Sequence, residues 1–216
     1  MEYDKFLALD EEKRERILNA AMTEFASGFK KASTDNIVRA AGISKGILFH
    51  YFGTKENLYN FIVDYAISIM DTEFFSLINL KQRDILDSIW QLSLLKQDLS
   101  LRYPTIFDFM TGVYLDRIDG PAKEKMDEIM TMRNEIIGEL YQNADRSLFR
   151  EDIDPQKAIH MIHWAMEGFA ESKANAIKMD EDGNSIRENY ESYLAEFREY
   201  LNILRKCFYI KREDSQ

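Results

Sequence analysis

The chain has 216 residues, 45% of them hydrophobic, so it can bury a substantial core. Only nine glycines and three prolines are present, and this scarcity of turn-forming residues favours an all-α protein. The net charge of −10 argues against nucleic-acid binding by the chain as a whole, and a single cysteine, Cys207, excludes an intrachain disulfide and fits a reducing cytoplasm. We find no signal peptide and no long uncharged apolar run, so we expect no membrane partner.

The first 53 residues carry the pattern of three short helices. The first is expected to begin at a cap on Asp10 and to end before Gly28. The second runs from a cap at 33–35 to Ala41, after which Gly42 supplies the left-handed residue that stops a helix. The third follows over 45–52, and the turn between the last two helices makes the group a helix-turn-helix.

The rest of the chain predicts longer helices, which gives about nine helices in all. We expect them near residues 54–78, 83–102, 104–116, 122–144, 155–178 and 185–210. The helix that begins at Thr54 is expected to join a small head to a larger body. The acidic stretch 180–184 lacks the full spacing of a calcium loop and is predicted to be a turn.

The acidic charge is concentrated in the part of the chain after residue 55. Residues 1–55 carry nine basic and eight acidic residues, whereas the remainder carries 19 and 30. A locally basic head on an acidic body can meet phosphate while the body repels nonspecific DNA. In the third helix Leu48 and Phe52 share the inward face, and the outward face keeps aromatic residues that a DNA groove would cover. The alternative is ordinary core packing of those aromatics.

A family resemblance decides between these alternatives. Residues 34–58, with the pieces AGISKG, HYF and TKENL, resemble the signature of the tetracycline-repressor (TetR) family. With the preceding helix the match spans about 50 residues, and the remaining roughly 160 residues are similar only in helical layout. The resemblance implies an all-α homodimer with a helix-turn-helix DNA-binding domain at 1–53 and a ligand-binding and dimerisation domain at 54–216. It also implies a regulator, commonly a repressor, that a small-molecule effector releases from double-stranded DNA.

Carried over by position, the resemblance assigns DNA contacts to the second and third helices. Phosphate contacts are expected at Thr34, Tyr51 and Lys55. The residues on or beside the groove are expected to be Ser44, Lys45, Gly46, Ile47, Phe49 and His50. The family usually has Tyr where this chain has Phe49, and commonly a small polar residue at the place of Ile47. We therefore expect apolar contact with a thymine methyl at Phe49 in place of a hydroxyl hydrogen bond.

The body is expected to hold an effector pocket and a dimer interface. The pocket candidates are aromatic, methionine and polar residues, namely Trp90, Phe107, Phe109, Met110, Tyr114, Met130, Tyr141, His163, Trp164 and Glu167. For each of them, ordinary core packing is the alternative. An apolar pocket implies a largely apolar ligand. The last two long helices carry apolar stripes, Ile159 to Ala170 and Tyr190 to Leu204, that by family layout would form a four-helix bundle between two protomers. The alternative is packing within one protomer, which we expect for some of these residues.

No catalytic motif, metal or cofactor is expected. His160, His163 and Glu167 share one helix face, but no second helix offers an obvious further ligand. Phosphate loops, nucleophile elbows and zinc-protease motifs do not occur. Two other readings stay open: a DNA-binding adaptor of this fold controlled by a protein partner, without a small-molecule inducer, and a helical enzyme or metal-binding protein.

Overall fold

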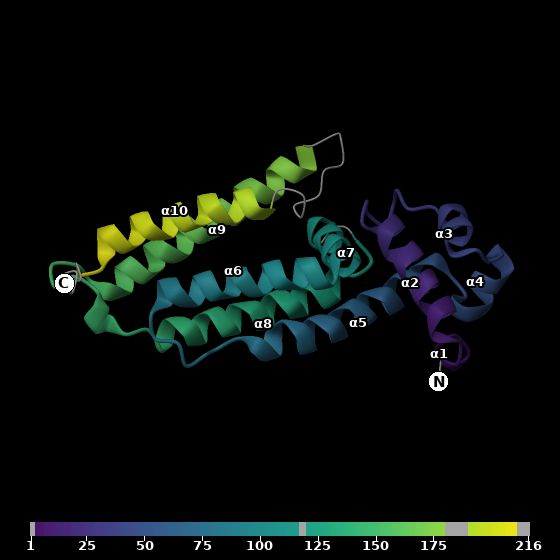
Figure 1. Cartoon of the computed structure of the whole chain (residues 1–216), viewed down its shortest axis with the longest axis horizontal. Coiled ribbons are helices and arrows are strands. Elements are labelled where there is room, and N and C mark those ends of the chain that lie inside the picture. Colours follow the sequence, from purple (N-terminus) through teal and green to yellow (C-terminus); the bar gives the residue numbers. More distant parts are fainter. Residues whose placement is uncertain (1–2, 117–119, 180–189, 211–216) are drawn as a thin grey trace. The chain divides into compact units, whose positions relative to one another are not determined.

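The computed structural model describes residues 3–116, 120–179 and 190–210, and in them it is entirely helical apart from one isolated bridge between Phe149 and Tyr209. Figure 1 labels the helices. Their bounds are α1 (Asp4–Leu7), α2 (Glu11–Phe25), α3 (Thr34–Ala41), α4 (Lys45–Phe52), α5 (Lys55–Glu73), α6 (Ile85–Arg102), α7 (Pro104–Leu115), α8 (Lys123–Gln142), α9 (Pro155–Met179) and α10 (Tyr190–Phe208), with short 3-10 turns at Phe75–Leu77 and Arg146–Leu148. No described helix is long and apolar enough to cross a membrane.

The predicted all-α fold is confirmed, and each of the nine predicted helices has a counterpart. The addition is α1, whose four residues are too few to give a periodic pattern. The predicted turn at 180–184 and the start of the last helix at 185–189 lie outside the described residues.

The chain folds into two compact units. The first contains Met1–Ser76 and Leu99–Thr131, and the second contains Leu77–Asp98 and Met132–Gln216. Helices α2 to α5 therefore share a compact unit with α7. The expected functional division at residues 53 and 54 concerns DNA and ligand binding, and it stays a prediction.

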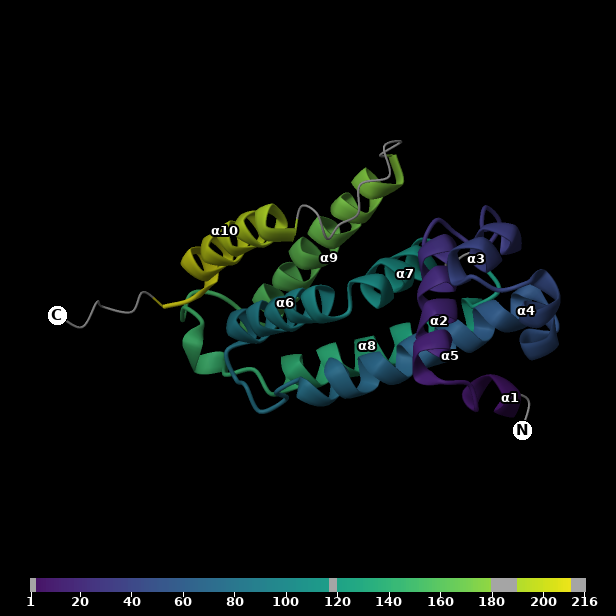
Figure 2. The ribbon, with the colours of Figure 1, turned by 45° about the vertical axis from the view of Figure 1, so that its right-hand side comes forward.

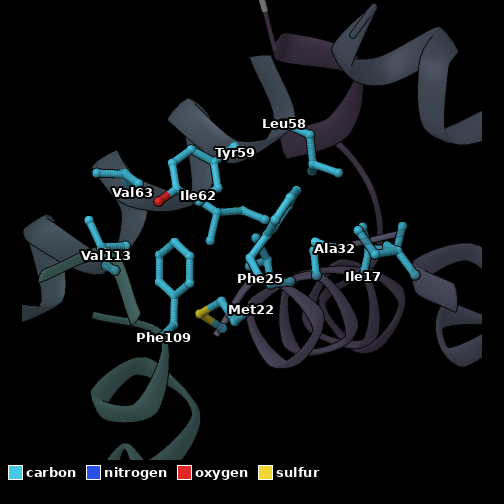
Figure 3. Packing of buried hydrophobic residues seen from close by; sticks show 14 of the residues in the cluster. Ile17, Met22, Phe25, Ala32, Leu58, Tyr59, Ile62, Val63, Phe109 and Val113 are labelled. Carbon is cyan, nitrogen blue, oxygen red and sulfur yellow. The ribbon is translucent and has the colours of Figure 1, made fainter. Parts of the chain in front are cut away.

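The core of the first unit joins the head helices to α7. The ring of Phe25 on α2 meets Tyr59 on α5 at 5.0 Å between centroids, and Tyr59 meets Phe109 on α7 at 5.8 Å, both edge to face. Figure 3 shows these rings with Met22 and Ile62 between the helices. Figure 2 shows α3 and α4 beside α2 in the same unit. Each of the three rings is at most 1% exposed, so the core fixes the positions of α2, α5 and α7 together.

The second unit packs α9 and α10 on its share of α6 and α8. Ile159, Ile162, Phe197 and Leu201 are at most 5% exposed and belong to one core. They come from the two stripes that were expected to face a partner protomer. For these four side chains the alternative, packing inside their own protomer, is the one that the structure shows. Both faces of α9 and α10 carry apolar residues, so periodicity alone cannot say which face turns inward.

Candidate nucleic-acid interface and effector-binding body

The helix-turn-helix is built from local signals in the sequence. Gly42 adopts φ 66° after α3, a left-handed conformation that ends the helix at no steric cost. Ser44 caps α4, and its Oγ accepts a hydrogen bond from the amide of Ile47 at 3.3 Å. Ser33 precedes α3 without a side-chain cap; its amide instead donates to Glu24 Oε1 at 2.8 Å. This bond ties the start of α3 to α2.

The inward face of α4 matches the sequence expectation, and the outward face matches it in part. Leu48 and Phe52 are 1% and 2% exposed and pack in the first core. Five residues of the predicted groove surface are exposed, namely Ser44, Lys45, Gly46, Ile47 and His50. They lie at the start of α4 and one turn further along it, so a single groove could meet all of them.

Phe49 and Tyr51 are half-buried rather than fully outward. The Tyr51 ring lies 5.9 Å from Phe6 of α1, which accounts for part of its burial. Thr34, expected at a phosphate, is half-buried at the first turn of α3. Lys45 Nζ lies 2.9 Å from Asp35 Oδ1 in an exposed ion pair, which a DNA phosphate would replace.

Lys55 has a second role that the sequence did not reveal. Its Nζ donates to the carbonyl oxygens of Phe29 and Ala32, each at 2.6 Å, and lies 4.6 Å from the centre of the Phe29 ring. These bonds fasten the loop between α2 and α3 to the start of α5. The expected phosphate contact stays a prediction, to be tested beside this structural role.

Lys5 is a candidate contact that sequence reasoning missed. Helix α1 is fixed to the head by Phe6, which is fully buried with its ring 4.8 Å from Phe52 and 5.3 Å from Phe61. The exposed Lys5 Nζ thereby lies 3.5 Å from His50 Nε2 on α4. The available signal was the aromatic pair Tyr3 and Phe6 ahead of the first predicted helix.

The ten predicted pocket residues divide between the two units. Phe107, Phe109, Met110, Tyr114 and Met130 belong to the first unit, and Trp90, Tyr141, His163, Trp164 and Glu167 belong to the second. Phe109 is fully buried against Tyr59, so packing accounts for it. Trp164 is 67% exposed, which places it on the surface of this protomer rather than in an interior pocket.

Three of the predicted residues meet in a polar cluster of the second unit. Tyr141 Oη lies 2.9 Å from His163 Nδ1, and Glu167 accepts an ion-paired hydrogen bond from Arg133. Burial, with the nearby charge of Glu167, raises the pKa of Tyr141 to about 12. His163 and Glu167 thus have other protein side chains as partners. Among the described residues, no group of three or more His, Cys, Asp or Glu side chains could hold a metal ion.

Trp90 lies elsewhere in the second unit, at a cavity of about 410 Å³ between α6 and α10. The guanidinium of Arg198 lies 5.3 Å from the centre of the Trp90 ring. The cavity is lined by the charged residues Asp87, Arg205 and Lys206 as well as by the apolar Leu86, Leu201 and Ile210, and Trp90 is the one predicted pocket residue among its lining residues.

Comparison with known proteins gives the family of the head. Residues 17–61 match the family of bacterial regulatory proteins described as tetR. That segment contains α3, α4, the C-terminal part of α2 and the start of α5.

Solved structures extend the likeness to the whole fold. A TetR family transcriptional regulator from Chloroflexus aurantiacus J-10-FL has a TM-score of 0.64 at 16% identity, over 96% of this chain and 98% of that one. A second TetR transcriptional regulator from that organism has a TM-score of 0.59 at 21% identity, over 89% of this chain and 95% of that one. The ketosteroid transcriptional regulator KstR2 of Mycobacterium tuberculosis has a TM-score of 0.56 at 14% identity, over 94% and 97%.

Proposed function

We propose that this chain, whose residues 17–61 match the tetR family of bacterial regulatory proteins, is a DNA-binding transcriptional regulator that represses transcription by binding a palindromic operator as a homodimer. The observation that carries the proposal is the exposed face of α4. Ser44, Lys45 and His50 offer hydrogen-bond donors there, and Gly46 allows close approach to DNA. The buried Leu48 and Phe52 hold this face in a fixed orientation.

A dimer would give the operator its symmetry. The second unit carries an exposed apolar face, here called the dimer face, formed by Met161 and Trp164 of α9 and Tyr200 and Ile203 of α10. The rings of Phe169 and Tyr200 lie 5.3 Å apart, which brings the two helices together at this face. Large apolar side chains that are 45% to 67% exposed favour a protein partner, and a second copy of the chain fits an isologous interface.

We propose that a small, largely apolar ligand releases the repressor from DNA. A ligand weakens DNA binding only if it binds a conformation with wrongly spaced DNA-binding heads more tightly than it binds the conformation that fits the operator. Helix α5, which the sequence predicts to join the head to the body, would carry this shift. In the first unit α7 shares the task, because it packs on α2 and its C-cap residue Asp116 accepts a hydrogen bond from the amide of Phe29 at 3.0 Å.

The test is to measure, by fluorescence anisotropy at several salt concentrations, the binding of the purified protein to DNA fragments from upstream of its own gene. We expect saturable binding to an inverted repeat, with a stoichiometry of two chains for each repeat, and its loss on adding an effector. Binding that no small molecule weakens, but that a protein from the same cell abolishes, would favour the adaptor of the same fold. Absence of specific binding to any genomic fragment would refute the proposal.

A further inference from the structure

A cavity of about 410 Å³ lies between α6 and α10, and all the residues that line it belong to the second unit. Its volume falls within the range of about 300 to 1,000 Å³ that is usual for small-molecule sites. The buried side chains of Leu86 and Leu201 and the half-buried ring of Trp90 form its apolar part. This part can hold the apolar body of a small organic molecule.

The polar part of the cavity comes mainly from α10. Arg198, Asn202 and Lys206 line it at every fourth position, so they follow one another along one face of that helix. The guanidinium of Arg198 lies 5.3 Å from the centre of the Trp90 ring, which places a positive charge beside the apolar part. Among the described residues, no hydrogen bond or ion pair involves the side chain of Arg198 or Lys206. Both side chains therefore keep their N–H donors for a ligand.

The third cation of the cavity, Arg205, already has carboxylate partners. Its guanidinium donates to Asp84 Oδ2 at 2.8 Å and to Asp87 Oδ1 at 2.6 Å. Counted together with Arg198 and Lys206, three positive charges face two negative ones, which leaves an excess of one positive charge. A single carboxylate balances this excess, whereas a doubly charged group would leave a negative charge unmatched beside Asp87.

The cavity and the dimer face lie on different sides of α10. Each residue of a helix turns the chain by about 100°, so Tyr200 and Ile203 of the dimer face point away from the side that carries Arg198 and Asn202. A second copy of the chain that covers the dimer face would therefore leave the cavity open to a ligand.

We propose that this cavity is a binding site for an aromatic monocarboxylate. Arg198 and Lys206 are separated by about 12 Å along the helix axis, so their long side chains can converge on one carboxylate above Asn202. The ring of the ligand packs against Trp90 and the two leucines, since flat aromatic rings gain from contact with one another beyond the area that they bury. The site goes beyond the proposed release from DNA, because a ligand can bind here whether or not it weakens operator binding.

The experiment is isothermal titration calorimetry on the full chain with three probes: naphthoate, the neutral naphthalenemethanol, and the saturated decalin carboxylate. We expect naphthoate to bind about tenfold more tightly than the alcohol, because a charge-assisted contact is added, and about threefold more tightly than the saturated acid. The double variant Arg198→Met, Lys206→Met should lose the preference for the acid over the alcohol and keep its affinity for the alcohol. The matched control Lys81→Met, Lys157→Met removes two exposed charges of the same unit outside the cavity and should bind all three probes as the wild type does.

The inference would be overturned by equal affinity for naphthoate and its alcohol, by the absence of binding of any probe, or by an undiminished preference in the double variant. Equal affinity for naphthoate and the saturated acid would overturn the assignment to an aromatic ligand. Because the heat of binding is measured without DNA, failure of the chain to bind an operator would refute the proposed function and leave this inference standing.

Discussion

Lys5 contributes a positive charge beside the recognition helix, outside the segment that matches the family. Its ammonium lies 3.5 Å from His50, where DNA phosphates would run along the edges of the groove. We expect Lys5→Ala to weaken binding to every DNA sequence and to reduce the slope of log affinity against log salt by about one unit, since one fewer counterion is released. Anisotropy titrations over a series of salt concentrations measure this. Lys157→Ala, an exposed charge on α9, serves as the control, and an unchanged slope in Lys5→Ala would remove it from the interface.

Lys55 is predicted to contribute to stability as well as to DNA binding. Lys55→Ala removes two charged hydrogen bonds from the loop carbonyls of Phe29 and Ala32. We expect the free energy of unfolding to fall by about 2 kcal/mol, which is the usual size for hydrogen bonds to a charged group at a half-buried site. Urea unfolding measures the loss, and Lys31→Ala, exposed in the same loop, should leave stability unchanged. A variant with wild-type stability and a reduced salt slope would make Lys55 a phosphate contact alone.

Helices α2 and α7 approach each other so closely that one position tolerates only glycine. A Cβ on Gly112 of α7 would lie 2.4 Å from the carbonyl oxygen of Ala26, which is backbone and cannot rotate away. We expect Gly112→Ala to destabilise the first unit by about 1–3 kcal/mol through overpacking. Gly138→Ala on α8, where nothing lies within 4 Å, should instead stabilise the protein by roughly 0.5–1 kcal/mol by restricting the unfolded chain. Thermal unfolding of both variants tests the contrast, and equal effects would mean that the two helices separate without cost.

Asp84 lies directly before α6 in the second unit, and its carboxylate binds backbone amides at the start of that helix. Its carboxylate is 9% exposed, accepts hydrogen bonds from the amides of Leu86 and Asp87, and pairs with Arg205 at 2.8 Å. Burial by itself would raise the pKa of Asp84, but the bonds from Arg205, the Asp87 amide and Tyr209 outweigh it and hold the pKa below its ordinary value.

A depressed folded-state pKa fixes the sign of the pH dependence. The Asp84 contribution is complete above the ordinary aspartate pKa of about 3.9, and it is lost as the pH falls from there through the lower pKa of the folded state. Asp84→Asn should cost about 2–3 kcal/mol at neutral pH, because Arg205 loses its buried partner and is itself only partly screened by solvent. Urea unfolding at neutral and acidic pH measures both effects. The variant should lose less stability on acidification than the wild type, and identical acid sensitivity would exclude Asp84 as the group that titrates.

The helix ends of this protein were largely predictable, but the direction in which the helices face was not. Asp10, Ser44 and Thr54 each accept the capping hydrogen bond that the sequence suggests, because a cap depends only on residues three positions apart. The roles of Lys5 and Lys55 depend on contacts 45 and 26 residues away, which no local pattern specifies. The faces of α9 and α10 could not be assigned for a related reason, since both faces are apolar and only tertiary packing selects the inward one.

For the whole molecule, the proposed function requires two heads at a defined separation. Two recognition helices read half-sites one DNA turn apart when they lie about 34 Å from each other. A single head would make half of these contacts and lose the gain in affinity that comes from linking two binding events. Operator affinity should therefore depend on the dimer face, although that face belongs to the second unit and the reading helix to the first.

Trp164→Glu is the substitution that tests this dependence. Trp164 is 67% exposed on α9, so the change removes no contact from the core, but it would bury two unpaired carboxylates about a two-fold axis in the dimer. We expect the variant to sediment as a folded monomer with unchanged helical circular dichroism, and to bind the operator at least 100-fold more weakly. Leu101→Glu, which replaces an apolar residue that is 72% exposed on α6, should remain dimeric and bind normally. A Trp164→Glu variant that stays dimeric would place the interface elsewhere. A monomer with full operator affinity would show instead that one head is enough for operator binding, and a palindromic operator would then not be required.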